Sequence, residues 1–513
     1  MLAPGSNVSS GRLQRAHLAR VPSKLAVRVA NASAVGCALD LERATYYRRS
    51  NISTGGAAVT IEQRWYAHKV HKALLVMEMD TVSTAAATLA LSLDQEHSSS
   101  VKLPPSYIDS PPEDDVEWAG APIPGCPEHL WCQLGNTTTP DVPTTPPTTI
   151  AYVSTRIPPT LEIPAGKQSQ VFLAAARTTH VSAAPLVDAL AAHKAATGTP
   201  GSSLLQSHQV AWLDTWSQSI IEFEGDDFVQ RAINATLYII LSGHDETFST
   251  GFPVSMEGLV EGAFGHWGGS VLWDADYWIY PAISMFRPSF QRDILQYRYN
   301  TMDQARLSAK RYGNRGAKFS WESASSGAEV SSGPGCSGKG FPCPAGVGPN
   351  GCGVREIHIG ADIVVTARRH WWQTRNFTWL RGVGQPIAAA VADYYCSRTT
   401  ASAALPLFSR GVTGGSRDRD RDRADQLSIA GVLGPDEHDD NVTDSTYTNA
   451  AAIAAIEFAI ESTEALNLTV DPLWRATANR LHIPFDAKLN IHPEFVGMDT
   501  TGFQSKQADT VML

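Results

Sequence analysis

The stretch QVFLAAARTTHVSAAPLVDAL, residues 170–190, marks the point where the pattern of apolar residues changes along this chain of 513 residues. Before it, apolar runs are short and alternate with polar residues, as in β-strands. After Pro185, apolar residues recur at helical spacing over long segments. Strands followed by helices, with no mixing of the two, indicate a β domain and then an α domain.

The first part of the chain, residues 1–184, is predicted to form a β-sandwich. The runs KLAVRVANA (24–32), AAVTIEQRWYA (57–67) and KALLVMEMD (72–80) are separated by clusters of Gly, Pro, Ser and Asn. Short alternating runs between turn-forming clusters are typical of sandwich strands. Residues 133–149 are rich in Thr and Pro, and we expect an exposed loop there.

The second part is predicted to be helical, with linker helices in residues 185–224 and an all-α domain in residues 225–513. Apolar spacing predicts long helices, without intervening strands, in four segments: 226–241, 289–313, 356–374 and 447–466. The run SRDRDRDRAD (416–425) has only Ala424 to bury. We expect it to be a solvated loop.

Net charge argues against a nucleic-acid partner, and hydropathy argues against a transmembrane segment. The net charge of -10 at pH 7 argues against binding to a nucleic-acid backbone, which requires clustered positive charge. No apolar run approaches the roughly 18 residues that a membrane-spanning helix needs. Neither a nucleic-acid partner nor a transmembrane segment is therefore expected.

Glycosylation acceptors and cysteines bear on the cellular compartment. Asn-x-Ser/Thr sequences favour the secretory pathway, with a vacuolar or extracellular destination, although a Ser/Thr-rich cytoplasmic chain also generates them. They begin at Asn7, Asn31, Asn51, Asn136, Asn234, Asn376, Asn441 and Asn467. The seven cysteines include no CxxC pair, which argues against a zinc ribbon. Cys126 and Cys132 are close enough for a local disulfide and are equally compatible with free thiols.

Aromatic residues and acids adjoin repeatedly in the second part. Asp274 lies next to Trp273 in LWDADYWIYP, and Glu322 lies next to Trp321 in FSWESASSG. A buried carboxylate needs polar partners, and sugar sites combine aromatic faces with hydrogen-bonding acids. The pattern predicts a polyhydroxyl site; the alternative is an aromatic core with acids at its rim.

The run GVLGPDEHDDN (431–441) places five charged or titratable residues behind a Gly-Pro turn. Three interpretations are an acidic surface loop, a cation site, and a carboxylic acid held out for proton transfer. The run lacks the alternating ligands and central Gly of a calcium loop. We therefore expect no calcium site in this run. No other metal and no cofactor are expected in the protein.

Five motifs in order resemble the catalytic region of glycoside hydrolase family 65, and in particular its eukaryotic glucosidases and acid-trehalase-like members. They are LWDADYWIYP, RGAKFSWESASSGAEV, REIHIGADIV, GVLGPDEHDDNVTDSTYTN and HPEFVGMDTTGFQSKQADTVML. The resemblance spans nearly the whole chain. It implies a β-sandwich followed by an (α/α)6 barrel, with the active site in the loops that join the barrel helices.

The resemblance also implies roles for individual residues. Glu437 matches the general acid, and Trp273 with Asp274 matches the pair that grips the terminal glucose. Lys506 and Gln507 match a further substrate-binding pair. Trp321 and Glu322 lie in a motif expected to line the substrate, and His358 is interpreted as structural rather than as a ligand.

The implied activity is exo-acting, inverting hydrolysis that releases glucose from an α-glucosyl disaccharide, such as the glucosyl-galactose unit on hydroxylysine of collagen. Inversion needs a protonated and an ionised carboxyl group. Repulsion from Asp436, Asp439 and Asp440 is expected to keep Glu437 protonated if these acids face inward. The alternatives are trehalose hydrolysis, phosphorolysis of a disaccharide, and a glycan-binding protein without catalysis.

Several departures from the family pattern accompany the resemblance. The general base, or the phosphate-binding segment of a phosphorylase, is expected beyond Leu513, and the start also lacks sandwich sequence. We therefore expect a chain that is incomplete at both ends, with an unclosed barrel. His438 replaces the usual Tyr after the acid.

Overall fold

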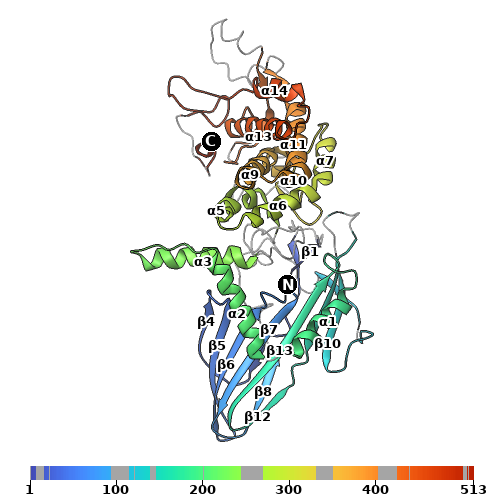
Figure 1. Ribbon diagram of the computed structural model, residues 1–513, viewed down its shortest axis with the longest axis vertical. Helices are drawn as coiled ribbons and strands as arrows, with labels where there is room; N and C mark the ends of the chain where they lie inside the picture. The colour runs from blue at the N-terminus through green and yellow to red at the C-terminus, as the bar shows by residue number, and fades with distance from the viewer. Residues whose placement is uncertain are drawn as a thin grey trace. The chain divides into compact units, whose positions relative to one another are not determined.

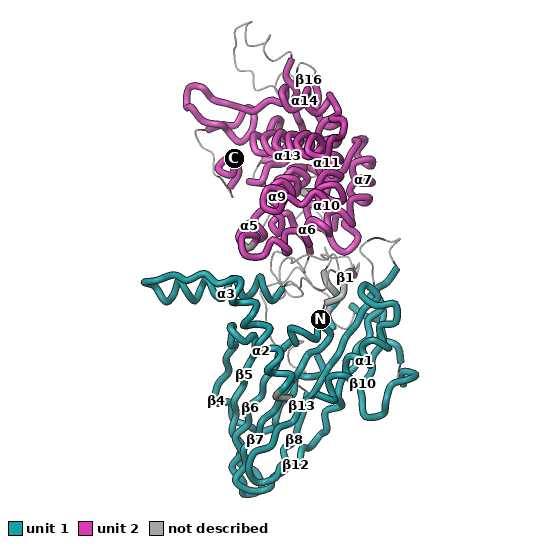
Figure 2. The backbone as a smooth tube through the Cα atoms, in the orientation of Figure 1, with its two compact units in different colours: residues 1–8, 17–250, 259–266 teal, residues 9–16, 251–258, 267–513 magenta. Residues whose placement is uncertain are grey.

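The computed structural model describes residues 2–6, 17–21, 23–93, 115–120, 122–138, 142, 146–199, 201–243, 270–330, 351–402, 425–437, 439–500, 505 and 508–513. They form two compact units (Figure 2), with described residues up to 243 in the first and those from 270 onward in the second. The first unit is rich in sheet and the second is helical. The predicted order of a β domain and then an α domain is confirmed; the predicted limits at residues 184 and 224 remain predictions.

An antiparallel sheet of eight strands is the main element of the first unit (Figure 1). Its strands lie in the order β4 (Ser33–Asp40), β5 (Thr45–Thr54), β6 (Ala57–Ala67), β7 (Leu74–Ser83), β13 (Gly166–Thr178), β11 (Thr149–Thr155), β10 (Leu130–Thr137) and β9 (Val116–Trp118). A smaller sheet has the order β12 (Thr160–Ile163), β8 (Ala87–Leu93) and β3 (Val27–Val29). Separately, β1 (Leu2–Ser6) pairs with β2 (His17–Arg20).

The core of the first unit lies between the two sheets. Met77 and Met79 of β7 share it with Leu89 of β8 and Phe172 of β13. Burying each such side chain is worth roughly 1.5–3 kcal/mol. On the other face of the large sheet, Val76 and its neighbours pack with helices α1 (Pro185–Thr197) and α2 (Gly201–Ser217). Burial on both faces explains why apolar residues occupy four consecutive positions, Leu74 to Met77, in β7.

Two histidines attach helix α2 to the large sheet. The Nε2 atoms of His68 and His208 hydrogen-bond to the carbonyl oxygens of Leu204 (3.1 Å) and Ala44 (3.2 Å). Their Nδ1 atoms accept backbone N–H groups from residues 69–71, so both rings are neutral in this arrangement. Burial lowers the pKa of each ring to about 4.

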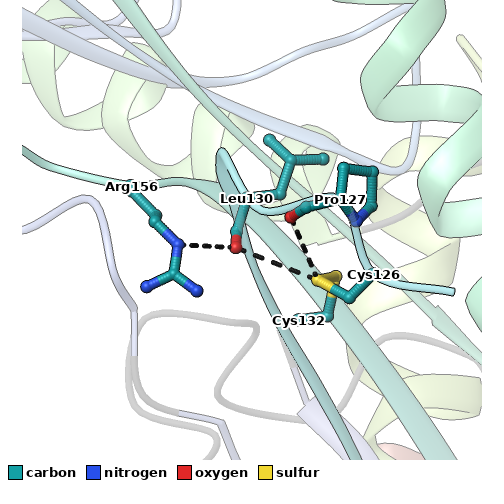
Figure 3. Close-up of a disulfide and its surroundings, with 5 residues drawn as sticks. All are labelled: Cys126, Pro127, Leu130, Cys132 and Arg156. Atoms are coloured by element: carbon teal, nitrogen blue, oxygen red, sulfur yellow. Dashed lines mark hydrogen bonds between the residues drawn. A yellow bond between two sulfur atoms is a disulfide. The ribbon is translucent and has the colours of Figure 1, made fainter. Parts of the chain in front are cut away.

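A disulfide joins Cys126 to Cys132 at the start of β10 (Figure 3). The Leu130 carbonyl oxygen lies 3.8 Å from the Cys126 sulfur and accepts a hydrogen bond from Arg156 Nε at 2.8 Å. The disulfide is thus one of the two alternatives that the sequence left open, and it fixes the turn that leads into this strand. Among described residues with free thiols, Cys37 is exposed and Cys396 is buried.

The prediction of a continuous loop over residues 133–149 is wrong in part. Strand β10 continues to Thr137, and β11 begins at Thr149. Thr is β-branched and suits a pleated surface, so the Thr-rich composition is compatible with a strand. Gly135 also allows a close approach, because a Cβ there would lie 2.7 Å from Val116 Cγ1 of β9.

The predicted helices are largely confirmed, with one correction. Helix α3 (Asp227–Gly243) follows the capping side chain of Asp226, and α9 (Ile359–Thr374) and α13 (Thr446–Ala465) match two further predictions. The predicted helix 289–313 is instead two helices, α6 (Pro288–Asn300) and α7 (Met302–Arg311). The Thr301 hydroxyl donates back to the Tyr297 carbonyl at 2.9 Å, a local bond that competes with continued helix.

The helices of the second unit pack around α9, α13 and α11 (Gln385–Arg398) (Figure 1). Gly360 of α9 faces α11, because a Cβ at this position would lie 3.4 Å from Val391. The remaining helical elements are η3 (Ala275–Ile279), α5 (Tyr280–Ser284), α8 (Gly351–Arg355), α10 (Phe377–Trp379), η5 (Leu380–Gly384), α14 (Pro472–Ala478) and η8 (Thr510–Met512). In the described portions of both units, no helix has the length and apolar character needed to cross a membrane.

Short ladders interrupt the helical unit, contrary to the expectation of helices without strands. The pairs are β14 (Val271–Leu272) with β15 (Glu322–Ser323), β16 (Thr400–Ala401) with β17 (Leu427–Ser428), and β18 (Ala430–Val432) with β19 (Val442–Thr443). Strands of two or three residues have too few alternating positions to produce a sequence signal. Two of these ladders position the candidate site.

Candidate active site

Trp273 and Asp274 lie between the end of β14 and the π-helix η3, a helical form that often marks functional sites. Trp273 is 5% exposed, and its ring meets His358 edge to face with centroids 4.8 Å apart. Burial, reinforced by the negative charge of Glu437, raises the pKa of Asp274 to about 6, although His358 opposes the shift. The Asp274 carboxylate is therefore within electrostatic reach of both Glu437 and His358.

The two acids of LWDADYWIYP have different surroundings. Asp276 is fully buried and accepts a hydrogen bond from Arg298 Nη2 at 2.5 Å. The same guanidinium donates to the Leu272 carbonyl at 3.3 Å. Asp276 thus forms an internal ion pair that anchors the end of β14, whereas Asp274 remains partly accessible.

The β14–β15 ladder brings Trp321 and Glu322 beside this segment, because Leu272 pairs with Glu322. Both side chains are buried. The Glu329 carboxylate accepts the backbone N–H groups of Trp321 at 2.8 Å and Glu322 at 3.1 Å. The Glu329 carboxylate therefore holds the backbone of the predicted lining pair, Trp321 and Glu322, next to Trp273.

Glu437 lies in the loop of the β18–β19 hairpin. Its N–H donates to the Gly434 carbonyl at 3.1 Å, and its φ of 55° is left-handed. A non-glycine residue in this conformation costs about 1 kcal/mol or more, and such strain often occurs at functional sites. The turn brings Glu437 into the electrostatic neighbourhood of Asp274, although the two are remote in sequence.

The acids around Glu437 have partners of their own. Asp440 forms an ion pair with Arg355. Asp436 accepts a hydrogen bond from the Ser505 hydroxyl at 3.3 Å, and its N–H donates to Asp509 Oδ2 at 3.5 Å. The predicted effect of these acids on the protonation of Glu437 remains a prediction.

Like-charge repulsion instead contributes to a raised pKa at two acids that the sequence analysis did not select. Burial, and then Asp509, Asp436 and Asp439, raises the pKa of Glu494 to about 8. Burial also raises the pKa of Asp509 to about 6, with a further contribution from Asp436. Both residues belong to the motif HPEFVGMDTTGFQSKQADTVML. Their position as acids within this motif is the sequence signal that could have selected them.

The predicted substrate pair Lys506 and Gln507 lies outside the described residues, as does His438. The described residues on either side, Ser505 and Asp509, both contact the acid loop through Asp436. A Cβ on Gly434 would lie only 2.6 Å from Asp509 Oδ2. Glycine is therefore required for the close approach of Asp509 to this loop.

His358 occupies the N-cap position of α9, without a capping side-chain hydrogen bond, within a buried cluster. Its Nδ1 lies 2.6 Å from Asp362 Oδ2, and its Nε2 lies 3.5 Å from Glu356 Oε2. The Tyr447 hydroxyl donates to the other oxygen of Asp362 at 2.7 Å. Burial by itself would lower the pKa of His358, but the two carboxylates outweigh burial and raise it to about 10.

The chemistry available to this arrangement is that of a sugar site. Trp273 offers an aromatic surface, Asp274 can accept hydrogen bonds from hydroxyl groups, and Glu437 can exchange a proton with an oxygen held between them. Within the described residues, no group of three or more His, Cys, Asp or Glu side chains is arranged to hold a metal ion.

Comparison with known proteins identifies a family and several relatives. Residues 236–512 match the family profile described as "Glycosyl hydrolase family 65 central catalytic domain". A zebrafish (Danio rerio) protein named protein-glucosylgalactosylhydroxylysine glucosidase is 32% identical over 460 residues, which cover 87% of this chain and 62% of the relative. A protein of the same name from Dictyostelium discoideum is 27% identical over 99% of this chain and 65% of its own length. The chain thus spans less than two thirds of the length of these curated relatives.

A solved structure shares the fold. The putative kojibiose phosphorylase from human microbiome superimposes with a TM-score of 0.71 over 95% of this chain and 64% of the other, at 14% sequence identity. The succession of a sheet-rich unit and a helical unit is therefore an arrangement found in an experimentally determined protein.

Proposed function

Because this chain belongs to glycoside hydrolase family 65, we propose that it is an exo-acting glucosidase that releases glucose from an α-glucosyl disaccharide by inverting acid/base hydrolysis. The observation that carries the proposal is the convergence of Trp273, Asp274 and Glu437 from two distant motifs. Burial is the main cause of the raised pKa of Asp274, and the negative charge of Glu437 contributes to it. Two carboxyl groups within electrostatic reach of each other, one of them directly following a tryptophan, are well suited to grip and protonate a terminal sugar.

Each residue has a distinct role in the proposal. Trp273 packs against the glucose ring, and ionised Asp274 accepts hydrogen bonds from its hydroxyl groups. Glu437 donates a proton to the departing glycosidic oxygen. Lys506 and Gln507 are proposed to bind the same glucose, and Trp321 and Glu322 to line the site. We assign the general base to none of the described residues.

We also propose that the helical unit belongs to an (α/α)6 barrel with a catalytic domain from about residue 225, preceded by linker helices from 185 and the sandwich before them. The two ladders at the site, β14–β15 and β18–β19, support the placement of the site in loops between helices. The proposed carbohydrate substrate is glucosyl-galactosyl-hydroxylysine, attached to collagen, because the relatives from zebrafish and Dictyostelium carry that name. Phosphorolysis is the second candidate, supported by the fold shared with the putative kojibiose phosphorylase.

Glucose release tests the proposal directly. The chain is incubated with glucosyl-galactosyl-hydroxylysine, trehalose or kojibiose, each with and without phosphate, and the anomer first released is identified by NMR. Hydrolysis with inversion predicts β-glucose from an α-linked substrate without phosphate. Glucose 1-phosphate formed only with phosphate would identify a phosphorylase. Glucose bound but never released would identify a glycan-binding relative.

Glu437→Gln is the decisive variant, because it keeps the shape of the side chain and removes the transferable proton. Activity is expected to fall by about two orders of magnitude or more. Glu457→Gln is the matched control, since Glu457 is an exposed residue of α13. Full activity in Glu437→Gln would refute the assignment of the acid.

A further inference from the structure

His358 is a buried base beside Trp273 of the candidate site, and the proposed chemistry does not use it. It is fully buried at the N-terminus of α9. A positive charge is unfavourable at that end of a helix. A charged ring persists there only if nearby carboxylates compensate for burial and for the helix dipole.

That compensation is present on both sides of the ring. Asp362 lies 2.6 Å from Nδ1, and Glu356 lies 3.5 Å from Nε2. The Tyr447 hydroxyl of α13 fixes Asp362 from behind at 2.7 Å. The hydrogen bond between Nδ1 and Asp362, together with the negative charge of Glu356 3.5 Å from Nε2, an atom without a hydrogen bond to the described residues, favours the imidazolium form of the ring.

The His358 ring also contacts aromatic residues at the candidate site and acts electrostatically on nearby acids. Its centroid lies 4.8 Å from that of Trp273, nearly perpendicular to it, and 5.5 Å from the ring of Tyr447. Its charge acts favourably on the carboxylates of Asp274, which follows β14, and of Asp509, which contacts the acid loop. His358 therefore adjoins the aromatic surface and lies within electrostatic reach of both acids.

We propose that His358 is a positioning residue of the glucose site: held as an imidazolium by Asp362 and Glu356, it orients the Trp273 ring and keeps the Asp274 carboxylate ionised for sugar binding. This inference rests on the proposed function, because it takes Trp273 and Asp274 to be the glucose grip. The charged groups that face the ring are Glu356 and Asp362 at the start of α9, Asp274 after β14, and Asp509 near the C-terminal end.

The test compares His358→Gln with His370→Gln in the full chain. Glutamine keeps a hydrogen-bond donor at position 358 but cannot carry the charge. His370 is a matched control: it lies on the same helix, is 4% exposed, and contacts Trp379 at a centroid distance of 4.5 Å. Glucose affinity is measured from tryptophan fluorescence between pH 5 and pH 9, and KM and kcat are measured with the preferred disaccharide.

In the wild type, glucose binding is expected to weaken as the pH falls through about 6, where Asp274 becomes protonated. Loss of the neighbouring positive charge makes Asp274 easier to protonate, so His358→Gln moves this midpoint upward by about one pH unit, equivalent to about tenfold in affinity below the midpoint. KM rises accordingly, and affinity recovers at pH 9. His370→Gln leaves the midpoint unchanged.

The outcomes separate the two proposals. An unchanged midpoint and KM in a folded His358→Gln protein overturns the inference and leaves the glucosidase intact. Glucose binding with the shifted midpoint, but no glucose release by the wild type, refutes the glucosidase and supports the positioning role. A wild type that binds no glucose refutes both.

A second measurement does not depend on how well the variant folds. In wild-type protein labelled with ¹⁵N-histidine, both ring nitrogens of His358 are expected to show imidazolium shifts at pH 7.5, whereas His370 is expected to be neutral because burial lowers its pKa to about 4. A neutral His358 ring at pH 7.5 overturns the inference.

Discussion

The ion pair between Asp276 and Arg298 allows a quantitative test of how the site is supported. The two groups are 0% and 1% exposed, and their closest atoms are 2.5 Å apart. Asp276→Asn keeps the shape and leaves the guanidinium buried without a counter-charge. Removing one partner of a buried pair costs about 3–5 kcal/mol. For a unit of this size each kcal/mol lowers Tm by about 2–4 °C, so we expect a loss of roughly 10 °C.

The assay is thermal unfolding followed by circular dichroism at a fixed heating rate, for wild type, Asp276→Asn and a control. Asp303→Asn is the control, because its partner Arg306 is 50% exposed and Asp303 is 92% exposed. Such a surface pair is worth about 0–1 kcal/mol. Asp276→Asn is also expected to weaken glucose binding, since Arg298 holds the end of the strand that precedes Trp273.

Equal stability losses in Asp276→Asn and Asp303→Asn would refute the reasoning, because the first pair would then behave as a solvated one. A combined Asp276→Leu and Arg298→Met variant provides a further check. Replacing both charges with apolar side chains of similar volume leaves no unpaired charge. It is expected to recover much of the stability without restoring the glucose affinity.

Three further perturbations test other parts of the structure. Replacing Cys126 and Cys132 with serine removes a short-loop disulfide and is expected to destabilise the sheet-rich unit by about 2 kcal/mol, measured by urea unfolding; equal stability with and without reductant would contradict this. His68 and His208 have a folded pKa of about 4, below the unfolded value near 6.5. As the pH is lowered from about 6.5 to 4, the free energy of unfolding is therefore expected to fall by up to about 1.4 kcal/mol per pH unit for each ring. His→Gln variants that keep the same acid sensitivity would exclude these two rings as its cause. Gly434→Ala would place a Cβ 2.6 Å from a buried carboxylate and is expected to lower kcat about tenfold or more. Gly382→Ala, where a Cβ would have nothing within 4 Å, is expected to leave kcat unchanged. A larger loss of kcat in Gly382→Ala than in Gly434→Ala would contradict the packing at the acid loop.

Local patterns were sufficient for the order of the domains and for most long helices. Alternation in the run 72–80 identified strand β7, and helical spacing identified α9 and α13. Such periodicities follow from the geometry of a single element. The break at Thr301 and the strand within residues 133–149 were missed because a hydroxyl back-bond and strand pairing do not alter the apolar pattern.

For the candidate site, too, the sequence revealed some features and only the structure revealed others. Resemblance in five motifs selected Trp273, Asp274 and Glu437, and the structure places Glu437 within electrostatic reach of Asp274. The resemblance did not distinguish the environment of Asp274 from that of Asp276, which differ in their access to Arg298. It also missed Glu494 and Asp509, whose raised pKa values arise from burial near Asp436.

The sequence by itself determined the β-then-α order, the family and the chemical types of residue available to the site, because these depend on composition, periodicity and motif order along one chain. Only the tertiary structure decided which carboxylates face one another, and that His358 lies between Asp362 and Glu356 rather than in an ordinary core. The physical reason is that electrostatic interaction and desolvation depend on distances between segments remote in sequence. Those distances follow from the packing of α9 against α13 and from the turn at Glu437, and no local pattern encodes them.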